Sequence, residues 1–284
     1  MSATIISGKD VAKDKRTQLK KKVEEIRSQG VVPKLIIILV GNDPASLSYI
    51  KGKKKAAEET GVDFTLEHLD EGTTEATLLQ LIDRYNNDNM VDGILVQLPL
   101  PAHIDETKVI EKISPEKDVD GFHPINIGRM MTQQDCFLPC TPAGILELIK
   151  TSDINISGKN AVIIGRSNIV GKPVGQMLLN EHATVTYCHS RTKNIEEFTK
   201  QADIVVVAVG IANFLPGNAI KEGAIVIDVG VNRLESGKLC GDVHFEEASE
   251  HAGHITPVPG GVGPMTITML ISNTVKAAEK RARK

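Results

Sequence analysis

The stretch NAVIIGRSNIVGKPVGQMLL, Asn160 to Leu179, decides how the second half of the chain folds. A continuous aliphatic run leads straight into Gly165-Arg166-Ser167, and Gly171 then begins an amphipathic helix. A strand, a glycine turn and a helix in this order direct backbone N–H groups at a pyrophosphate. Ser167 stands where the usual fingerprint has its second glycine, so the pattern alone leaves an ordinary strand-to-helix turn as the alternative.

The next predicted strand lies in ATVTYCHSRT and ends about 20 residues farther on, where a dinucleotide-binding fold contacts the ribose. An NAD enzyme typically carries an acid there, whereas this chain has His189-Ser190-Arg191. Ser190 can donate a hydrogen bond to a phosphate, and Arg191 and Arg166 can pair with one. The sequence therefore predicts NADP rather than NAD as the cofactor, with a solvated side chain as the alternative for Arg191.

Short aliphatic runs alternate with amphipathic stretches along the rest of the chain. Continuous Val, Ile and Leu runs are typical of parallel strands buried on both faces, and their alternation with helices predicts an α/β fold. The predicted strands are 35–40, 63–69, 93–98, 160–164, 184–188, 204–209 and 224–229. The predicted helices are 11–28, 45–60, 75–86, 171–180 and 194–201.

Two irregular stretches suggest two domains. Residues 114–144 are rich in Pro, Gly and Asp and lack periodicity, which favours a crossover with a helix beginning near Thr141-Pro142. HITPVPGGVGPMT precedes a last helix of roughly 265–281. We expect an N-terminal α/β catalytic domain of residues 1–140, rejoined by 265–284. A Rossmann-type NADP-binding domain would cover 141–264, with a cleft between the two domains.

The bulk composition is that of an ordinary soluble protein. The chain has 284 residues, of which 41% are hydrophobic and 24% charged, and its net charge of -3 argues against a nucleic-acid binder. The longest aliphatic run, Leu35–Val40, is too short to span a membrane. The four cysteines are scattered and form no CxxC pair, which suits a reducing compartment. We predict a cytoplasmic protein with no metal site.

The stretch YIKGKKKAAEE, Tyr49 to Glu59, contains four lysines. On a helix that turns ~100° per residue, Lys51, Lys54 and Lys55 lie on the side opposite Tyr49 and are predicted to be solvated. Lys53 instead stacks over Tyr49 at i, i+4. It is either a snorkelling surface residue or a placed catalytic group, and a role in proton transfer requires burial that lowers its pKa.

Two further segments supply candidate site residues. GILVQLPLP places Gln97 at the carboxyl end of a buried strand, where ligands bind in open parallel sheets, although an exposed strand-end residue is the alternative. There Gln97 could hold the Lys53 amine by a hydrogen bond. KDVDGFHP holds Asp118 and Asp120 beside Gly121, either as plain turn residues or as an acid that binds a nitrogen-rich heterocycle.

Six motifs occur in order along the chain: SLSYIKGK, GILVQLPLP, KDVDGFHP, PCTPAG, GRSNIVGKP and TPVPGGVGPMT. Together they resemble the bifunctional methylenetetrahydrofolate dehydrogenase/cyclohydrolase family, from about residue 35 to the last helix. The resemblance implies a homodimer that oxidises methylenetetrahydrofolate with NADP and hydrolyses the methenyl product to 10-formyltetrahydrofolate. Folate would bind in the cleft between the domains.

The resemblance also implies roles for individual residues. Lys53 would be the general acid/base, with Gln97 orienting it, Tyr49 stacking on the folate and Asp120 anchoring the pterin ring. The folate would also be bordered by Val96, Leu98, Pro259, Gly260, Gly261, Val262 and Gly263. The dinucleotide would contact Gly165, Arg166, Ser167, Ser190 and Val231, beside the Arg191 that the residues themselves suggest as a phosphate ligand. The alternatives are a dehydrogenase without cyclohydrolase activity and, in a different class, a non-catalytic NADP-binding regulator.

Overall fold

The computed structural model describes residues 2–283, which divide into two compact units. Unit 1 combines the N-terminal residues up to Ala12 with Thr141–Thr266. Unit 2 combines Lys13–Cys140 with the residues from Ile267 onward. Two helices, α1 (Gly8–Ser28) and α10 (Val262–Ala282), each have residues in both units.

The division differs from the expected one at the N-terminus. Strand β1 (Thr4–Ile5) pairs in parallel with β11 (His254–Ile255), far along the chain. Ile6 N–H also donates to Ile255 O at 2.8 Å. These backbone hydrogen bonds tie residues 2–12 to unit 1, whereas the sequence suggested that they belong with residues 13–140.

Unit 1 is built on a six-stranded sheet in the order β1-β11-β8-β7-β5-β6, and every neighbouring pair in it is parallel. Its longer strands are β5 (Asn160–Ile164), β6 (Thr184–Cys188), β7 (Ile204–Val207) and β8 (Ile225–Asp228). The chain leaves β5 toward β6 on one side and returns to β7 on the other. This reversal is the point at which doubly wound sheets bind nucleotides.

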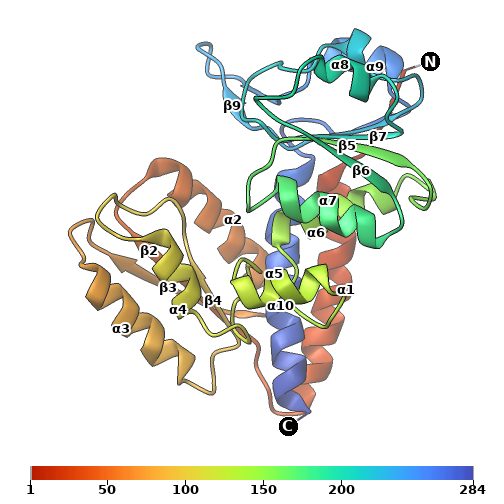
Figure 1. The fold of residues 1–284 in the computed structure, drawn as a ribbon. Coiled ribbons are helices and arrows are strands. Elements are labelled where there is room, and N and C mark those ends of the chain that lie inside the picture. The colour runs from red at the N-terminus through yellow and green to blue at the C-terminus, as the bar shows by residue number, and fades with distance from the viewer. Residues whose placement is uncertain (1, 284) are drawn as a thin grey trace. The chain divides into compact units, whose positions relative to one another are not determined.

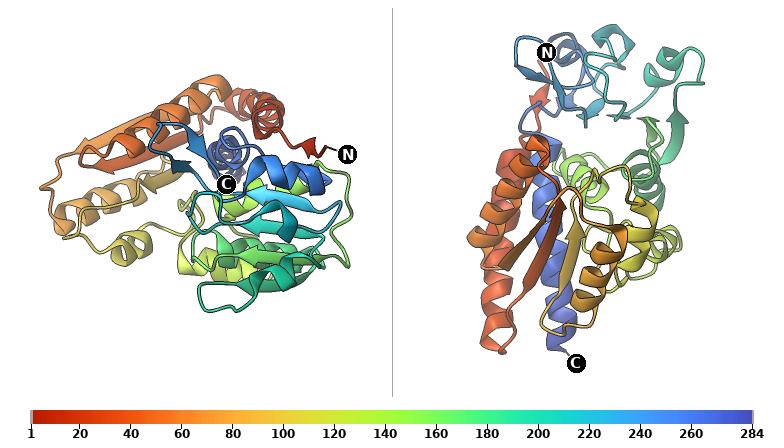
Figure 2. Two further views of the ribbon diagram at one scale, coloured as in Figure 1. Left: turned by 90° about the horizontal axis from the view of Figure 1, so that it is seen from above. Right: turned by 90° about the vertical axis from the view of Figure 1, so that its left-hand side faces the viewer.

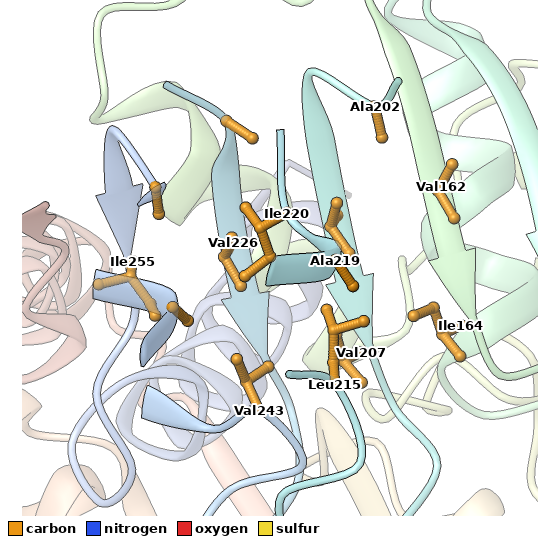
Figure 3. Packing of buried hydrophobic residues seen from close by; sticks show 14 of the residues in the cluster. Val162, Ile164, Ala202, Val207, Leu215, Ala219, Ile220, Val226, Val243 and Ile255 are labelled. Atoms are coloured by element: carbon orange, nitrogen blue, oxygen red, sulfur yellow. The ribbon is translucent and has the colours of Figure 1, made fainter. Parts of the chain in front are cut away.

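Helices and short segments complete unit 1. They are α6 (Cys140–Lys150), α7 (Gly171–Asn180), α8 (Ile195–Thr199), η1 (Gly217–Ala219), α9 (Phe245–His251) and an antiparallel pair of β9 (Asn232–Arg233) and β10 (Leu239–Cys240). Figure 3 shows Val207 and Val226 from neighbouring strands packed with Leu215 and Ile220 from the segment near η1. All four side chains are buried, so this apolar cluster holds the connecting segments against the sheet.

Unit 2 contains a three-stranded parallel sheet in the order β3-β2-β4. Its elements are β2 (Lys34–Val40), α2 (Pro44–Thr60), β3 (Asp63–Leu69), α3 (Glu75–Asn86), β4 (Gly93–Val96), α4 (Glu106–Lys112) and α5 (Pro124–Met131). Ile36 and Ile38 of β2 pack with Leu78 and Ile82 of α3 and with Val109 of α4 in one buried cluster. Figure 1 shows α3 and α4 beside this sheet.

Within unit 2, α1 and α10 run side by side, as Figures 1 and 2 both show. Arg16 of α1 donates to Thr268 Oγ1 of α10 at 2.9 Å. Near its end, α10 also reaches the sheet, because Arg281 donates to both carboxylate oxygens of Asp92 at 2.8 and 2.9 Å. The Asp92 side chain is only 2% exposed, so this pair anchors the last helix to the start of β4.

The predicted strands and helices are present, with small shifts at their ends. The predicted irregular stretch is only partly irregular, because α5 forms within it. His123 Nδ1 accepts the Ile125 N–H at 3.1 Å and so caps this short helix, which sequence periodicity does not reveal. Strands β1 and β11 have two residues each, which is too short for a periodic pattern.

Across residues 2–283, no helix combines the length and the apolar character needed to cross a membrane.

Replacing Arg281 by Ala should lower the free energy of unfolding by about 3 kcal/mol, because it leaves the buried Asp92 carboxylate without its cation. Arg283→Ala is the matched control, since Arg283 is exposed, and should change stability by no more than about 0.5 kcal/mol. Urea unfolding of the two variants beside the wild type measures both values. Equal effects would show that the Arg281–Asp92 pair does not anchor α10.

Candidate active site

Helix α2 carries the lysine run, and its ends are well defined. The Asp43 carboxylate accepts the Ser46 N–H at 2.7 Å at the start, and Gly61 ends the helix at φ 82°. Lys51, Lys54 and Lys55 are exposed, as predicted, whereas the Lys53 residue is only 8% exposed. One lysine of the four is therefore withdrawn from water.

A hydrogen bond fixes the buried amine. Lys53 Nζ donates to Gln97 Oε1 at 2.8 Å, and Gln97 Nε2 donates to Leu98 O at 2.7 Å. The second bond orients the Gln97 amide, so that its oxygen faces the lysine. Gln97 N–H also donates to Ile38 O at 2.8 Å, which continues the β2–β4 pairing past the end of β4. Gln97 is thus a strand-end residue held by the sheet.

Asp120 and Cys140 complete the electrostatic surroundings of Lys53. Burial lowers the pKa of Lys53, and the nearby Asp120 and Cys140 act in the opposite direction. Burial likewise raises the pKa of Asp120 from 3.8 to about 6, against the attraction of the Lys53 cation. A lysine and an acid whose pKa values move toward each other, in one desolvated place, are suited to proton transfer.

The structure separates the two acids of KDVDGFHP. Asp118 is 2% exposed and accepts backbone N–H groups from Gly121, Phe122 and His123, at 3.2, 3.4 and 2.8 Å. It therefore builds the turn. Asp120 lies on the same turn, with its carboxylate close enough to Lys53 to shift that amine's pKa. Of the two acids, Asp120 is the candidate for ligand binding.

Cys140 was not singled out in the sequence as a site residue. It is 1% exposed, its thiol donates to Val119 O at 3.2 Å, and its N–H donates to Asp120 O at 3.2 Å. Burial, and then the Asp120 charge, raise its pKa well above the usual value for a thiol. The motif PCTPAG was the available signal, but proximity to Asp120 depends on the tertiary fold.

The other candidate residues of unit 2 lie close in sequence to Lys53 and Gln97. Tyr49 lies one turn before Lys53 on α2 and is 44% exposed. Val96 ends β4 and is 8% exposed, while Leu98 follows Gln97 and is partly buried. An exposed aromatic ring can stack on a planar ligand. Val96 and Leu98 are the chain neighbours of Gln97 at the end of the strand.

The glycine turn of unit 1 is closely packed. Gly165 has φ 122°, and a Cβ atom there would lie 2.3 Å from Ala208 O. A Cβ atom at Gly171 would lie 2.4 Å from Gly165 O. Neither position has room for a side chain, so both must be glycine for the turn and the start of α7 to pack this closely. Ser167 Oγ accepts the Val170 and Gly171 N–H groups at 3.1 and 3.2 Å, so the residue in the second glycine's place also caps α7.

Polar and cationic side chains that could bind a phosphate lie just beyond the carboxyl ends of neighbouring strands of the sheet. Arg166 follows β5, and Ser190 and Arg191 follow β6; all three are exposed. Val231 follows β8 and is 53% exposed. An exposed hydroxyl and two guanidinium groups beside a glycine turn fit a dinucleotide that carries an additional phosphate.

The PGGVG segment, Pro259 to Gly263, belongs to unit 1, whereas Lys53 belongs to unit 2. It follows β11 and leads into α10. Lys9 N–H donates to Gly260 O at 3.0 Å, and a Cβ atom at Gly8 would lie 1.8 Å from Gly261 O. The absence of a side chain at Gly8 therefore lets the segment pack against the start of α1. Lys53 and its partners thus belong to unit 2, and the glycine turn with the loops beside it belongs to unit 1.

Within residues 2–283, no group of three or more His, Cys, Asp or Glu side chains is arranged to hold a metal ion. The chemistry proposed below uses the lysine, the amide and the carboxylate already described.

Two family models match the chain and together cover most of it. The model described as the catalytic domain of tetrahydrofolate dehydrogenase/cyclohydrolase matches residues 6–120. The model of the NAD(P)-binding domain of the same family matches residues 139–282. The second match contains the glycine turn, and the first contains Lys53, Gln97 and Asp120.

Relatives and solved structures agree with these matches. "Bifunctional protein FolD" of Bacillus subtilis is 67% identical over 280 residues, which cover 99% of either chain. The crystal structure of the bifunctional enzyme FolD from Campylobacter jejuni is 52% identical, with a TM-score of 0.97 and coverage of 99% of this chain and 100% of that one. The Trypanosoma brucei dehydrogenase-cyclohydrolase, solved with NADP and an inhibitor, is 38% identical, with a TM-score of 0.95 and full coverage of both chains. The chain belongs to the tetrahydrofolate dehydrogenase/cyclohydrolase family.

Proposed function

We infer that the chain is a bifunctional enzyme of folate one-carbon metabolism. It oxidises 5,10-methylenetetrahydrofolate to 5,10-methenyltetrahydrofolate with NADP and hydrolyses the product to 10-formyltetrahydrofolate. The observation that carries this inference is the buried Lys53, 8% exposed and bonded to Gln97 at 2.8 Å, in a chain of this family. A solvated lysine face would need neither the burial nor the amide partner.

The dehydrogenase step depends mainly on position. When bound, NADP accepts a hydride from the one-carbon bridge of the folate. In unit 1, Gly165, Arg166 and Ser167 would hold the pyrophosphate, and Ser190 and Arg191 the additional phosphate. The exposed Val231 would contact the nicotinamide. These residues bind and orient, and they supply no proton for this step.

The hydrolysis step requires proton transfer, and Lys53 supplies it. Water attacks the electrophilic methenyl carbon while the neutral amine takes a proton from that water. The resulting ammonium then returns a proton to the departing ring nitrogen as the C–N bond breaks. The hydroxyl group of the adduct loses its own proton to solvent as it becomes the formyl carbonyl, so one proton is released overall. Burial lowers the pKa of Lys53 and so increases the fraction of neutral amine. The hydrogen bond to Gln97 directs Nζ during both transfers.

The remaining candidates would bind the folate. Asp120 would accept hydrogen bonds from the nitrogen-rich pterin edge, where a paired acceptor matches adjacent N–H donors. The exposed Tyr49 ring would stack on the ligand. Val96 and Leu98 flank Gln97 at the strand end, and Pro259–Gly263 would border the folate from unit 1.

A dehydrogenase without cyclohydrolase activity is the second candidate. One similar structure, 44% identical with a TM-score of 0.94, is described simply as a methylenetetrahydrofolate dehydrogenase of the silkworm. A folate-positioning Lys53 would serve such an enzyme. The bifunctional assignment is favoured because burial, the Gln97 bond and Asp120 all act on the protonation of one amine.

Assembly and location are further parts of the proposal. We propose a homodimer, on the strength of the family resemblance, and light scattering of the purified protein tests it. We also propose a cytoplasmic location, supported by the four cysteines, all of which are free thiols and three of which are buried. A reducing compartment preserves such thiols.

The first prediction from the proposed function concerns Lys53. With methylenetetrahydrofolate and NADP, the wild type should produce NADPH and formylfolate while methenylfolate stays low. In Lys53→Met, hydrolysis should fall by at least about a hundredfold and methenylfolate should accumulate, because the general acid/base is gone. Lys54→Met, an exposed neighbour on the same helix, should behave like the wild type. Undiminished hydrolysis in Lys53→Met would leave the dehydrogenase alone as the better assignment.

The second prediction concerns the choice of cofactor. Arg191→Ala should raise the KM for NADP roughly 10- to 100-fold by removing a charge-assisted hydrogen bond to the additional phosphate. The KM for NAD should change by less than about twofold. Lys193→Ala removes an exposed cation two residues away and controls for the general loss of positive charge. If Arg191→Ala weakens both cofactors equally, Arg191 does not contact that phosphate.

The third prediction concerns the pKa of Asp120. Because the folded state raises this pKa from 3.8 to about 6, folding favours the protonated acid. The contribution of this carboxyl group to stability is therefore full below pH 4 and is lost as the pH rises to about 6. Relative to Asp120→Asn, the wild type should lose at most about 3 kcal/mol across this window and nothing more above it. Denaturant unfolding at a series of pH values measures the difference, and a constant difference would place the pKa near 3.8.

A further inference from the structure

Two carboxylates of unit 1 have no part in the chemistry described above. Asp228 ends β8 and is 2% exposed, and Asp242 follows β10 and is 0% exposed. An ionised carboxylate in such a place is costly unless several donors satisfy it. Their hydrogen bonds therefore show what the fold uses them to hold.

Asp242 joins two loops at the carboxyl edge of the sheet. Its Oδ2 accepts the N–H groups of Val209 and Gly210, at 2.7 and 2.8 Å, just beyond β7. Its Oδ1 accepts a hydrogen bond from Asn232 Nδ2 at 2.8 Å, where the segment that follows β8 enters β9. One side chain thus fixes the loops that follow two neighbouring strands.

Asp228 in turn fixes the segment that carries Asp242. It accepts the N–H groups of Gly230, Asp242 and Val243 at 3.0, 2.9 and 3.0 Å. The packing is reciprocal: a Cβ atom at Gly230 would lie 2.1 Å from Asp242 Oδ1, and one at Gly241 would lie 1.7 Å from Asp228 Oδ2. Each carboxylate fills the space left by a glycine beside the other, so neither loop can shift independently.

Both loops border the proposed dinucleotide site. The loop beyond β7 contacts the pyrophosphate turn, because a Cβ atom at Gly165 would lie 2.3 Å from Ala208 O. The loop beyond β8 carries Val231, which is 53% exposed and immediately precedes Asn232. Asp242 therefore lies behind the two backbone segments that would face the pyrophosphate and the nicotinamide.

We propose that Asp242 is a positioning residue for the dinucleotide, acting through Val209-Gly210 on one side and Asn232 on the other. This inference rests on the proposed function, since it concerns the NADP site of that enzyme. Asp242 itself is buried and does not touch the cofactor. It presents the two loops in their binding arrangement before the cofactor arrives, so that binding does not have to order them.

Four variants test the proposal, because each one leaves a different set of hydrogen-bond donors and acceptors at positions 242 and 232. Asp242→Ala removes the acceptor for all three donors and should raise the KM for NADP on the order of tenfold or more. Asp242→Asn should stay within about threefold, because its amide oxygen can keep the two backbone donors while the Asn232 amide turns over to accept from the new NH₂. Asn232→Asp places two carboxylates together and should raise the KM, and Asp242→Asn combined with Asn232→Asp should restore it.

The cyclohydrolase reaction is the internal control, since it needs Lys53 of unit 2 and no dinucleotide. The proposal expects hydrolysis of methenyltetrahydrofolate to stay within about twofold in every variant whose NADP affinity falls. Unchanged KM values in Asp242→Ala and Asn232→Asp would overturn it. So would a parallel loss of both activities and of melting temperature that the double substitution fails to reverse. Absence of dehydrogenase activity in the wild type would instead refute the proposed function itself.

Discussion

Parallel strand pairing is the constraint on which both units depend. In a parallel sheet every strand ends at the same edge, so residues distant in sequence meet beyond the carboxyl ends of neighbouring strands. In unit 2 this places Gln97, at the end of β4, opposite Lys53 of α2. In unit 1 it gathers the glycine turn after β5 with the loops after β7 and β8.

Three buried sites, at Asp242, Asp92 and Lys53, show different solutions to the cost of removing charge from water. Asp242 is satisfied by three donors and has a fixed neighbourhood. Arg281 and Asp92 neutralise each other in a paired geometry. Lys53 has an amide partner and a nearby acid, and burial lowers its pKa. The first two arrangements satisfy a buried carboxylate with hydrogen-bond donors, whereas burial in the third favours the neutral amine, as proton exchange requires.

These differences separate structure from chemistry at the level of single residues. Asp118 and Asp120 are only two positions apart. Asp118 accepts three successive backbone N–H groups, whereas Asp120 lies close enough to Lys53 for the lysine charge to affect its pKa. Lys53 and Lys54 are adjacent on α2, yet one is buried and the other exposed. In both cases a local pattern offers two equivalent candidates, and the surrounding fold distinguishes them.

The sequence by itself determined the α/β class, the main strands and helices, and the face of α2 on which Lys53 lies, because these follow from local periodicity. It also predicted the glycine turn, since its strand and helix are contiguous in the chain. Only the tertiary structure decided that residues 2–12 join unit 1, that Cys140 lies beside Asp120, and that Asp242 ties two loops together. Each of these depends on contacts between segments far apart in sequence, which local patterns do not encode.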